Sequence, residues 1–543
     1  MRSFLLKTAS LLLLLALIYP LKVNAQQQYR NHEQVSDRLK ELANSYQDYA
    51  SLSSIAKSPG NRDIWKLTIG SGNIENKPAL AIVAGAGGSH ILGIELAVKT
   101  AEHLLENSAD DEIRRLLNQH VFYIFPNINP DASEQFFSEL RYERTVNGKD
   151  TDLDRDGRIS EDPFNDLNGD GIIAMMRVED PTGKWRVLED DPRIMIKADI
   201  LKGEKGKFHL FTEGRDEDLD GEFNEDPSGG VNINKNFTYQ YPAFERGAGE
   251  HPVSENENRA LLDFLYEAFN VYAVVTFGHT NNLTDPWKFN RQAVSKRVIS
   301  GPLENDAEIM ALVTDEYKKF VSDKNAPKYK LQKGGFVEWG YFHYARPSFG
   351  TPAWWIPPPD SGKTDENAEV AFLNWAGSYG VENAFIDWQE IDHPDFPDHK
   401  TEVGGVPPFA MTTPPYEMVD SISMAHNKFI MRLTEMRPEL TFENVKIENA
   451  GRNLTRITLD LHNRGILPTS TELGPRTKWV RPVNVRLEAG GSLKVVSGKP
   501  VFQIDRIEGD SSEKVSWLIR GKGSIKITAG TPGAGFAELE QDI

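Results

Sequence analysis

The sequence of 543 residues contains no cysteine. This absence excludes disulfide bonds, a thiol nucleophile and any metal site with cysteine ligands. Basic residues are fewer than acidic ones: the chain has 61 lysines and arginines against 80 aspartates and glutamates, which gives a formal net charge of −19. A chain this acidic is expected to avoid nucleic acid and anionic membrane surfaces.

The sequence has one long apolar run, which lies near the N-terminus. Arg2 and Lys7 form a basic start and Val23-Asn24-Ala25 is a small-residue cleavage site, so we predict a secretory signal peptide over residues 1–25. The alternative is an uncleaved membrane anchor. No cysteine follows that could carry a lipid. We therefore expect a secreted or periplasmic protein that is not stably inserted in a membrane after cleavage.

Buried-strand patterns alternate with helical patterns in the larger part of the chain. Three apolar runs end in polar residues, at Gly87–His90, Asn127–Asp131 and His279–Asn282. Strands that alternate with helices predict an α/β domain with a mainly parallel sheet. The chemistry of such domains gathers at the carboxyl ends of the strands, so these three strand ends are candidate site segments.

The pattern changes near residue 440, where short alternating strands separated by turn residues predict a β-sandwich. The helical segment SISMAHNKFIMRLTEM directly precedes this change. We therefore expect a signal peptide over 1–25, an α/β domain over 26–438 and a β-sandwich domain over 439–543.

Three acidic loops lie in an insertion at about residues 150–226, each with carboxylate or amide oxygens two residues apart and then a glycine. Calcium binds six to eight such oxygens, and glycine permits the sharp turn that brings them together. No loop completes an EF-hand, since Pro163 occupies the twelfth place from Asp152, although Glu161 or Asp162 can close that first site. Solvated acidic turns are the alternative. The predicted calcium ligands, with a structural role, are Asp152, Asp154, Asp156, Asp166, Asn168, Asp170, Asp216, Asp218 and Asp220.

Four further segments occur in the order of a known family. They are NINPD from Asn127, GGVNINKNFTYQYP from Gly229, GEHPVSENENRALLDFL from Gly249 and VVTFGHTNN from Val274. Together they resemble the zinc carboxypeptidases of the carboxypeptidase A type over roughly residues 30–435, and the acidic loops resemble a bacterial secreted branch. The resemblance implies a mixed eight-stranded sheet between helices.

The resemblance also implies a zinc ion held by a His-x-x-Glu pair and a later histidine, with a separate glutamate as general base. In an alignment without gaps the first histidine falls on Gly87 and the glutamate on His90. Moving His90 to the first place would put Gly93 where the glutamate belongs. His279 matches the last ligand, and the general base falls on Pro352. Zinc binding is therefore in doubt, because two of the three ligands are changed, and no general base is retained.

The family holds the terminal carboxylate of its substrate with an Asn-Arg pair, because arginine binds carboxylates with two parallel hydrogen bonds. Asn234 matches the asparagine, and Lys235 stands at the arginine position with a point charge instead of a fork. The favoured interpretation is a catalytically impaired protein that binds peptide C-termini in a degenerate cleft.

Two alternatives remain open at this point. The first is an active metallocarboxypeptidase in which His90 and His279 share a metal with a third ligand from Glu338, Asp387, Glu390 or His393. The second is a calcium-stiffened secreted binding or adhesion module, in which Trp354 and Trp355 form an apolar platform and the β-sandwich docks a polymer.

Overall fold

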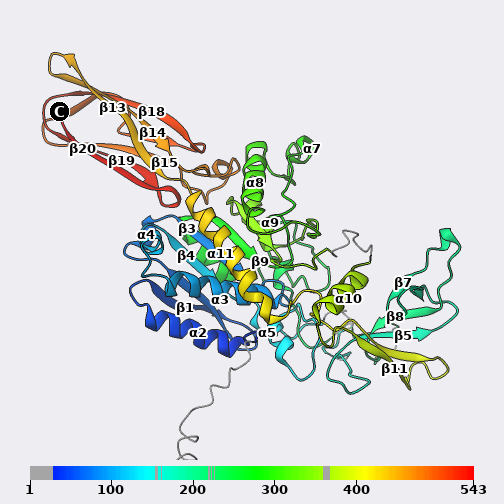
Figure 1. Ribbon diagram of the computed structural model, residues 1–543. Coiled ribbons are helices and arrows are strands. Elements are labelled where there is room, and N and C mark those ends of the chain that lie inside the picture. The colour runs from blue at the N-terminus through cyan, green and yellow to red at the C-terminus, as the bar shows by residue number, and fades with distance from the viewer. Residues whose placement is uncertain are drawn as a thin grey trace, which may run out of the picture.

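The computed structural model describes residues 28–152, 157–160, 162–217, 221, 223–224, 227–358 and 367–543. The predicted signal peptide lies outside these residues, as do Asp154, Asp156, Asp218 and Asp220 of the acidic loops. Figure 1 shows a central α/β body, an arm of strands on one side and a strand-rich C-terminal part on another. In the described ranges, no helix is long and apolar enough to cross a membrane.

The body is built on a mixed sheet of six strands, counted over the described residues, in the order β1-β2-β4-β3-β9-β10. The strands are β1 (Ala50–Lys57), β2 (Asp63–Ile69), β3 (Ala79–Ala84), β4 (Val121–Phe125), β9 (Val271–Phe277) and β10 (Ser348–Thr351). Strands β4, β3, β9 and β10 are parallel, while β1 and β2 are antiparallel additions. The α/β class with a mixed sheet is confirmed, with six strands where the resemblance implies eight.

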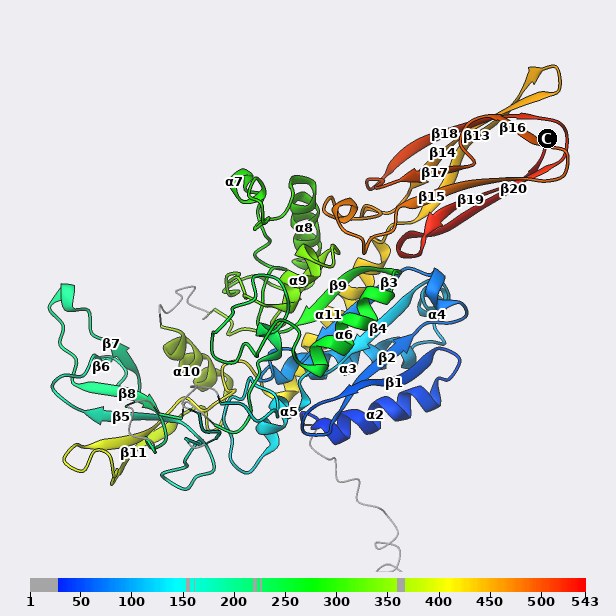
Figure 2. The ribbon, with the colours of Figure 1, turned by 180° about the vertical axis from the view of Figure 1, so that it is seen from behind.

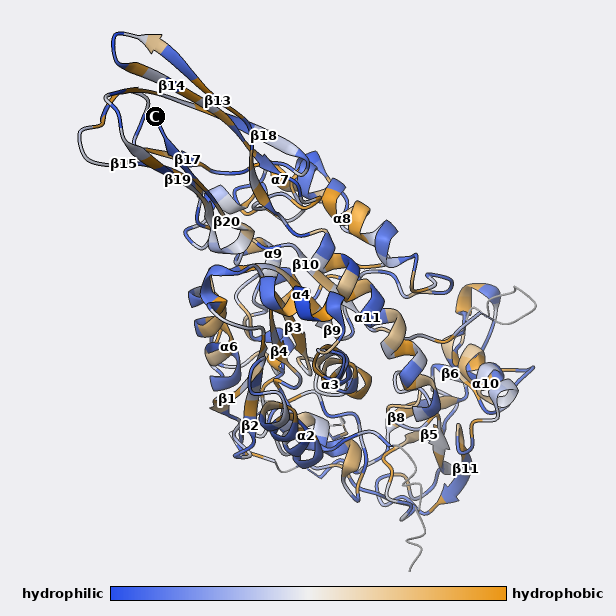
Figure 3. Cartoon of the chain, turned by 60° about the vertical axis from the view of Figure 1, so that its left-hand side comes forward, coloured by the Kyte–Doolittle hydropathy of each residue, from blue (hydrophilic) through white to orange (hydrophobic). Residues whose placement is uncertain are grey.

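Helices cover both faces of this sheet. Successive side chains of a strand point to opposite faces, and in the central strands both sets are apolar. Leu80 and Ile82 of β3 pack in one apolar cluster with α3, whereas Ala81 and Val83 pack in another with α6. Figure 3 shows hydrophobic residues concentrated between these layers. The helices are α2 (His32–Ser45), α3 (Ile91–Glu106), α4 (Asp111–Gln119), α5 (Pro130–Ser133), α6 (Asn256–Glu267), α7 (Arg291–Val294), α8 (Glu304–Tyr317), α9 (Phe336–Phe342), α10 (Ala368–Tyr379) and α11 (Val419–Glu435).

The arm contains a second sheet, in the order β11-β12-β5-β8-β6-β7, which the sequence patterns did not predict. It projects away from the body in both Figure 1 and Figure 2. Its strands come from two parts of the chain more than 170 residues apart, and β12 pairs with β5. The strands are β5 (Met175–Glu179), β6 (Trp185–Val187), β7 (Met195–Lys197), β8 (Phe208–Thr212), β11 (Ile386–Ile391) and β12 (Thr401–Gly405).

The C-terminal part consists of two four-stranded antiparallel sheets, β13-β14-β18-β16 and β17-β15-β19-β20, which confirms the predicted β-sandwich. Trp517 is buried between them and donates its indole N–H to the carbonyl of Lys499 at 2.7 Å. Four residues separate the end of helix α11 from the start of β13. The domain boundary at 438/439 lies between these two elements and stays a prediction. The strands are β13 (Leu440–Gly451), β14 (Leu454–Asn463), β15 (Val483–Ala489), β16 (Lys494–Ser497), β17 (Val501–Ile504), β18 (Ser511–Arg520), β19 (Ser524–Thr531) and β20 (Gly535–Asp542).

Candidate functional site

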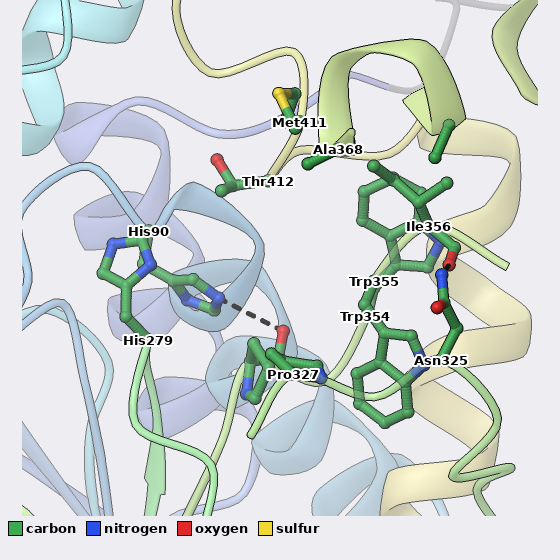
Figure 4. Close-up of a pocket in the computed structure, with 12 residues that line it drawn as sticks. His90, His279, Asn325, Pro327, Trp354, Trp355, Ile356, Ala368, Met411 and Thr412 are labelled. Carbon is green, nitrogen blue, oxygen red and sulfur yellow. Dashed lines mark hydrogen bonds between the residues drawn. The ribbon is translucent and has the colours of Figure 1, made fainter. Parts of the chain in front are cut away.

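The candidate site lies where the carboxyl ends of β3, β9 and β10 meet. His90 caps α3 just after β3, His279 follows β9, and Pro352 follows β10. The imidazole rings of His90 and His279 are in edge contact, with centroids 5.0 Å apart and an interplanar angle of 80°. Both rings line a cavity of about 440 Å³ whose other walls are mainly apolar, including Trp354 and Met411 (Figure 4). The parallel sheet thus brings together residues that are far apart in the sequence.

His90 uses both of its ring nitrogens inside the protein. Nδ1 accepts a hydrogen bond from the backbone N–H of Gly93 at 3.2 Å, and Nε2 lies 3.2 Å from the carbonyl oxygen of Pro352, to which it donates. This pattern requires the neutral Nε2–H tautomer. Burial, with a smaller contribution from His279, lowers the pKa of His90 to about 3. His90 therefore has no lone pair left for a metal, and it ties the start of α3 to the end of β10.

His279 faces the cleft from the end of β9. Its side chain is exposed to the cleft. Desolvation by the surrounding protein lowers the pKa of His279, and the negative charge of Glu143 partly offsets this effect. Its Nε2 atom lies 3.3 Å from the hydroxyl oxygen of Ser89. His279 is thus in contact with the turn that follows β3 and open to the cleft.

Gly87 is packed directly against His279. A Cβ atom at position 87 would lie 2.8 Å from Cδ2 and 3.3 Å from Nε2 of His279. A side chain at position 87 would therefore point at the His279 ring, and the alignment of this position with the first ligand of the family stays a prediction. Because the residue is glycine, the ring occupies the space that a side chain would need.

The residues present at this cleft do not fit a zinc ion. Within the described ranges, no three histidine, aspartate or glutamate side chains are grouped so that they could hold a metal. Glu338 is buried and accepts hydrogen bonds from the Tyr329 hydroxyl and the Gln332 N–H. His393 donates to the carbonyl of Gly214 in the arm. None of the four alternative ligands lines the cavity beside the two histidines.

A buried chain of hydrogen bonds fixes the end of β10, beneath Pro352. His426 donates from Nδ1 to the carbonyl of Ile422 at 2.8 Å, so its Nε2 accepts from the Tyr317 hydroxyl at 3.0 Å. The Tyr317 oxygen then accepts from the Thr351 hydroxyl at 2.9 Å, and Thr351 accepts from the N–H of Ala353. Sequence reasoning missed this network, because its members belong to three separate elements and form no local motif.

We expect the Tyr317→Phe variant to be less stable by about 1–3 kcal/mol, because it leaves a buried acceptor on His426 and a donor on Thr351 unsatisfied. Urea denaturation followed by circular dichroism measures this loss. Tyr379→Phe, at an exposed position in α10, is the matched control and should change stability by less than about 0.5 kcal/mol. Equal stabilities of the two variants would contradict the network.

Asn234 and Lys235 do not line the cavity beside the histidines. The side-chain oxygen of Asn234 accepts from the backbone N–H of Phe336 at 2.9 Å. Lys235 donates to the carbonyl of Arg246 at 3.2 Å and lines a second cavity of about 270 Å³, together with Arg246, Arg144 and Glu143. Glu143, which lines this second cavity, accepts from the backbone N–H of Phe409 at 2.8 Å, two residues before Met411 of the first cavity, so the two cavities are neighbours.

In the acidic loops, the described aspartate side chains accept hydrogen bonds from backbone N–H groups of the same loop. Asp166 accepts from the backbone N–H groups of Gly169, Asp170 and Gly171, and Asp152 and Asp216 accept from Gly157 and Gly221. In the same region, burial and the neighbouring carboxyl group of Asp162 raise the pKa of Glu217 to about 7. A cation would relieve this crowding of carboxylates. Calcium binding in these loops stays a prediction.

Comparison with known proteins agrees with the fold. A zinc carboxypeptidase model matches residues 35–350, and a domain of unknown function matches residues 439–542. Carboxypeptidase M of Mus musculus is 30% identical over 124 residues, which is 22% of this chain and 28% of that protein. Carboxypeptidase D of Drosophila melanogaster is 28% identical over 161 residues, or 27% of this chain and 11% of that protein. The chain thus matches less than a third of the length of either relative.

Solved structures match the chain at lower identity. The thrombin activatable fibrinolysis inhibitor structure is 13% identical with a TM-score of 0.44, and the match covers 75% of this chain and 74% of that chain. The carboxypeptidase A of Helicoverpa armigera is 14% identical with a TM-score of 0.35, covering 64% and 70%. The family model itself spans more than half of the 543 residues and contains the strand ends that carry His90 and His279. The chain belongs to the zinc carboxypeptidase family.

Proposed function

We propose that this protein is a secreted family member that has lost zinc-dependent hydrolysis and binds peptide C-termini in the remaining cleft. The observation that carries the proposal is the engagement of both His90 nitrogens, by Gly93 and by Pro352. Gly87 and Pro352, at the positions of a ligand and of the general base, can neither bind a metal nor move a proton. The cleft therefore lacks the groups that the family's reaction needs.

The binding part of the proposal rests on the two neighbouring cavities. The second cavity is lined by the cations Lys235, Arg144 and Arg246, which suit a terminal carboxylate. The guanidinium group of Arg144 is held in place because it donates to the carbonyls of Val146 and Asn147. Lys235 supplies the most adaptable charge, since a lysine ammonium group lies on a flexible stem. The apolar cavity beside His279 would take side chains of the same peptide.

The Lys235→Met variant is expected to bind peptides with a free C-terminus at least tenfold more weakly, a loss of about 1.4 kcal/mol or more. The physical reason is that methionine keeps the length of the side chain and removes its charge. Isothermal titration with one peptide, in free-acid and in C-terminally amidated form, measures the effect. The amidated form should bind weakly to both proteins.

Lys522→Met, at an exposed position of the β-sandwich, is the matched control and should bind like the unchanged protein. The proposal fails if purified protein contains stoichiometric zinc and releases C-terminal residues in a chelator-sensitive reaction. It also fails if the amidated and free-acid peptides bind equally well.

A further inference from the structure

The outer end of the arm exposes two consecutive apolar side chains. Ile200 and Leu201 lie in the loop that joins β7 to β8, in the short 3-10 turn Ile200–Lys202, and they are 80% and 95% exposed. A single exposed apolar residue is ordinary in a folded protein. Two adjacent side chains that are almost fully exposed contribute nothing to a core, and peptide binding in the cleft makes no use of them. They therefore require a separate explanation.

The register of the arm sheet places this loop at the end that is remote from the body. The chain enters the arm at Met175, which pairs with Thr212 at the end of β8. At the other end of the same pair of strands, Glu179 lies opposite Phe208, where β8 begins. The loop of residues 198–207 leads into β8 at that end, and the arm projects away from the body in both Figure 1 and Figure 2. The two apolar side chains thus lie at the tip of the arm.

Hydrogen bonds give this loop a defined conformation. Glu204 accepts from the backbone N–H of Asp199 at 2.8 Å and from the guanidinium group of Arg186 at 2.7 Å and 3.0 Å. Asp199 accepts from the N–H of Leu201 at 3.0 Å, and Gly203 ends the turn with a φ of +79°. Both carboxylates of the loop therefore serve its own structure, and the tip presents its apolar side chains without refolding.

Lysines surround the two apolar side chains. Residues 179–187 and 195–208, which form this end of the arm, contain six cations and four carboxylates, a local net charge of +2 in a chain whose net charge is −19. All five lysines are exposed, whereas three of the four carboxylates are half-buried. The exposed charge of the tip is therefore positive. The lysines are Lys184, Lys197, Lys202, Lys205 and Lys207.

These features fit the surface of an anionic lipid bilayer. Binding to such a surface depends on the apolar area that enters the interface and on the attraction between basic residues and lipid head groups. A specific protein–protein interface buries about 800 Å² on each partner, which is more than two side chains on a projecting tip can cover. Trp185 donates no charge but lies beside the loop, with Nζ of Lys197 5.3 Å from its ring centroid, and tryptophan is enriched at the boundary between membrane and water.

The overall acidity of the chain does not prevent this contact. Charges in solution are screened over about 8 Å at physiological ionic strength. Because the arm projects away from the body, head groups that contact the tip meet its lysines first (Figure 1). The expectation drawn from the whole-chain charge, that the chain avoids anionic membranes, therefore concerns the body and not this tip.

We propose that the arm docks the protein on anionic phospholipid bilayers. Ile200 and Leu201 enter the interfacial region of the bilayer, and the surrounding lysines contact its head groups. The contact is peripheral and reversible, because two side chains bury far less apolar surface than a membrane-spanning segment. This inference goes beyond the proposed function and uses none of the cleft residues, so each of the two can fail without the other.

Sedimentation of the full chain with lipid vesicles tests the apolar part of the contact. We expect binding to vesicles of phosphatidylcholine that contain phosphatidylglycerol, and weaker binding to vesicles of phosphatidylcholine alone. Ile200→Ser combined with Leu201→Ser should weaken binding to the anionic vesicles at least about tenfold, because it removes the apolar surface that enters the interface. Val298→Ser combined with Met424→Ser, at body positions that are 64% and 59% exposed, is the matched control and should bind like the unchanged protein.

The same assay tests the charged part. Lys205→Gln combined with Lys207→Gln should weaken binding at least about tenfold, since each lysine near an anionic surface contributes roughly fivefold. Lys494→Gln combined with Lys522→Gln, at exposed positions of the β-sandwich, is the matched control and should leave binding unchanged. Raising the salt concentration from about 0.1 M to about 1 M should also weaken binding, because the screening length falls from about 10 Å to about 3 Å.

The absence of cysteine allows a probe at a single position. Leu201→Cys, labelled with a nitrobenzoxadiazole fluorophore, should show blue-shifted and brighter emission on adding anionic vesicles, whereas Ser322→Cys at an exposed loop position should not. All variants keep the same N-terminal segment, so the affinity of that segment for lipid does not contribute to the differences between them. Melting temperatures show that each variant is folded.

Four results would each overturn the inference. The unchanged protein does not bind the anionic vesicles, or phosphatidylglycerol does not strengthen its binding. The apolar double variant binds as strongly as the unchanged protein. The probe at residue 201 shows no shift although the protein binds, in which case another surface contacts the lipid.

Discussion

Replacing Gly87 with histidine and His90 with glutamate is expected to create a zinc site in a cleft whose native residues do not fit the metal. A Cβ atom at position 87 points at Nε2 of His279, at 3.3 Å, and the ring of residue 90 lies 5.0 Å from that of His279. The His279 ring must move aside to admit a side chain at position 87, after which the three side chains face the same space at the edge of the sheet. With Gly87→His and His90→Glu they supply two imidazoles and a carboxylate, which is a complete protein ligand set for zinc with one open position.

The expected gain in affinity is large. We expect the apparent Kd for zinc to fall from above about 10 µM to below about 10 nM, which is three decades or about 4 kcal/mol. Without metal, the double variant should be less stable than the native chain, because it loses the bond from His90 to the carbonyl of Pro352. Zinc at about 1,000 times the Kd should then stabilise it by about 4 kcal/mol. Competition titration with a chromophoric chelator and thermal unfolding with and without zinc measure both effects.

Two further variants make this result specific. His279→Ala in the double variant should abolish tight zinc binding, since it removes the third ligand. His120→Ala in the same background removes a buried histidine at the opposite end of β4 and should leave the zinc affinity unchanged. The double variant should not hydrolyse peptides, because Pro352 still occupies the position of the general base. Micromolar or weaker binding by the double variant would show that position 87 is not the first ligand position.

The sequence predicted the parts of the fold that depend on local patterns. The apolar runs at β3, β4 and β9 form the parallel centre of the sheet, and the alternating strands after residue 440 form a β-sandwich. The arm could not be predicted, because β5 and β12 are short and their pairing joins segments more than 170 residues apart. The alternation of buried and exposed residues within a strand does not indicate which distant strand it pairs with.

Part of the candidate site could likewise be predicted from the sequence and part could not. The alignment of short motifs placed His90, His279 and Pro352 at one sheet edge, and the structure brings all three together. It also grouped Asn234 with Lys235 as one carboxylate-binding pair, whereas the Asn234 oxygen is bonded to a backbone N–H and Lys235 faces the second cavity. A motif shows which residues are present, but the direction of each side chain depends on neighbours that are distant in the sequence.

Loss of the Asp131 carboxylate is expected to destabilise the body by about 3–5 kcal/mol, the cost of removing one partner from a buried, charged hydrogen-bond network. One oxygen accepts from the Ser58 hydroxyl at 2.7 Å and from Arg62 at 2.8 Å. The other accepts from the N–H groups of Gly60 at 2.9 Å and Gly148 at 3.1 Å. In Asp131→Ala these four donors, which join the β1–β2 turn and the segment at Gly148 to α5, lose their acceptor.

The effect should depend on pH in a defined direction. Burial by itself raises the pKa of Asp131, but the Gly60 N–H, the Ser58 hydroxyl and Arg62 together hold it below its usual range. For a carboxyl group with a lowered folded pKa, the stabilisation is complete above the unfolded pKa of about 3.9 and is lost as the pH falls through the folded value. The difference between native protein and Asp131→Ala should therefore be constant from neutral pH to about pH 5 and shrink only below about pH 4.

Urea denaturation at a series of pH values measures this difference, and the surface ion pair of Asp420 provides the matched control. Lys99 lies 2.7 Å from Asp420, whose side chain is 66% exposed, so the pair is as short as the bonds to Asp131 but is open to solvent. Asp420→Ala should cost less than about 1 kcal/mol, since water and salt screen an exposed pair. If both variants lose the same small amount, burial does not strengthen the Asp131 network. If the Asp131→Ala difference already disappears near pH 6, another group controls it.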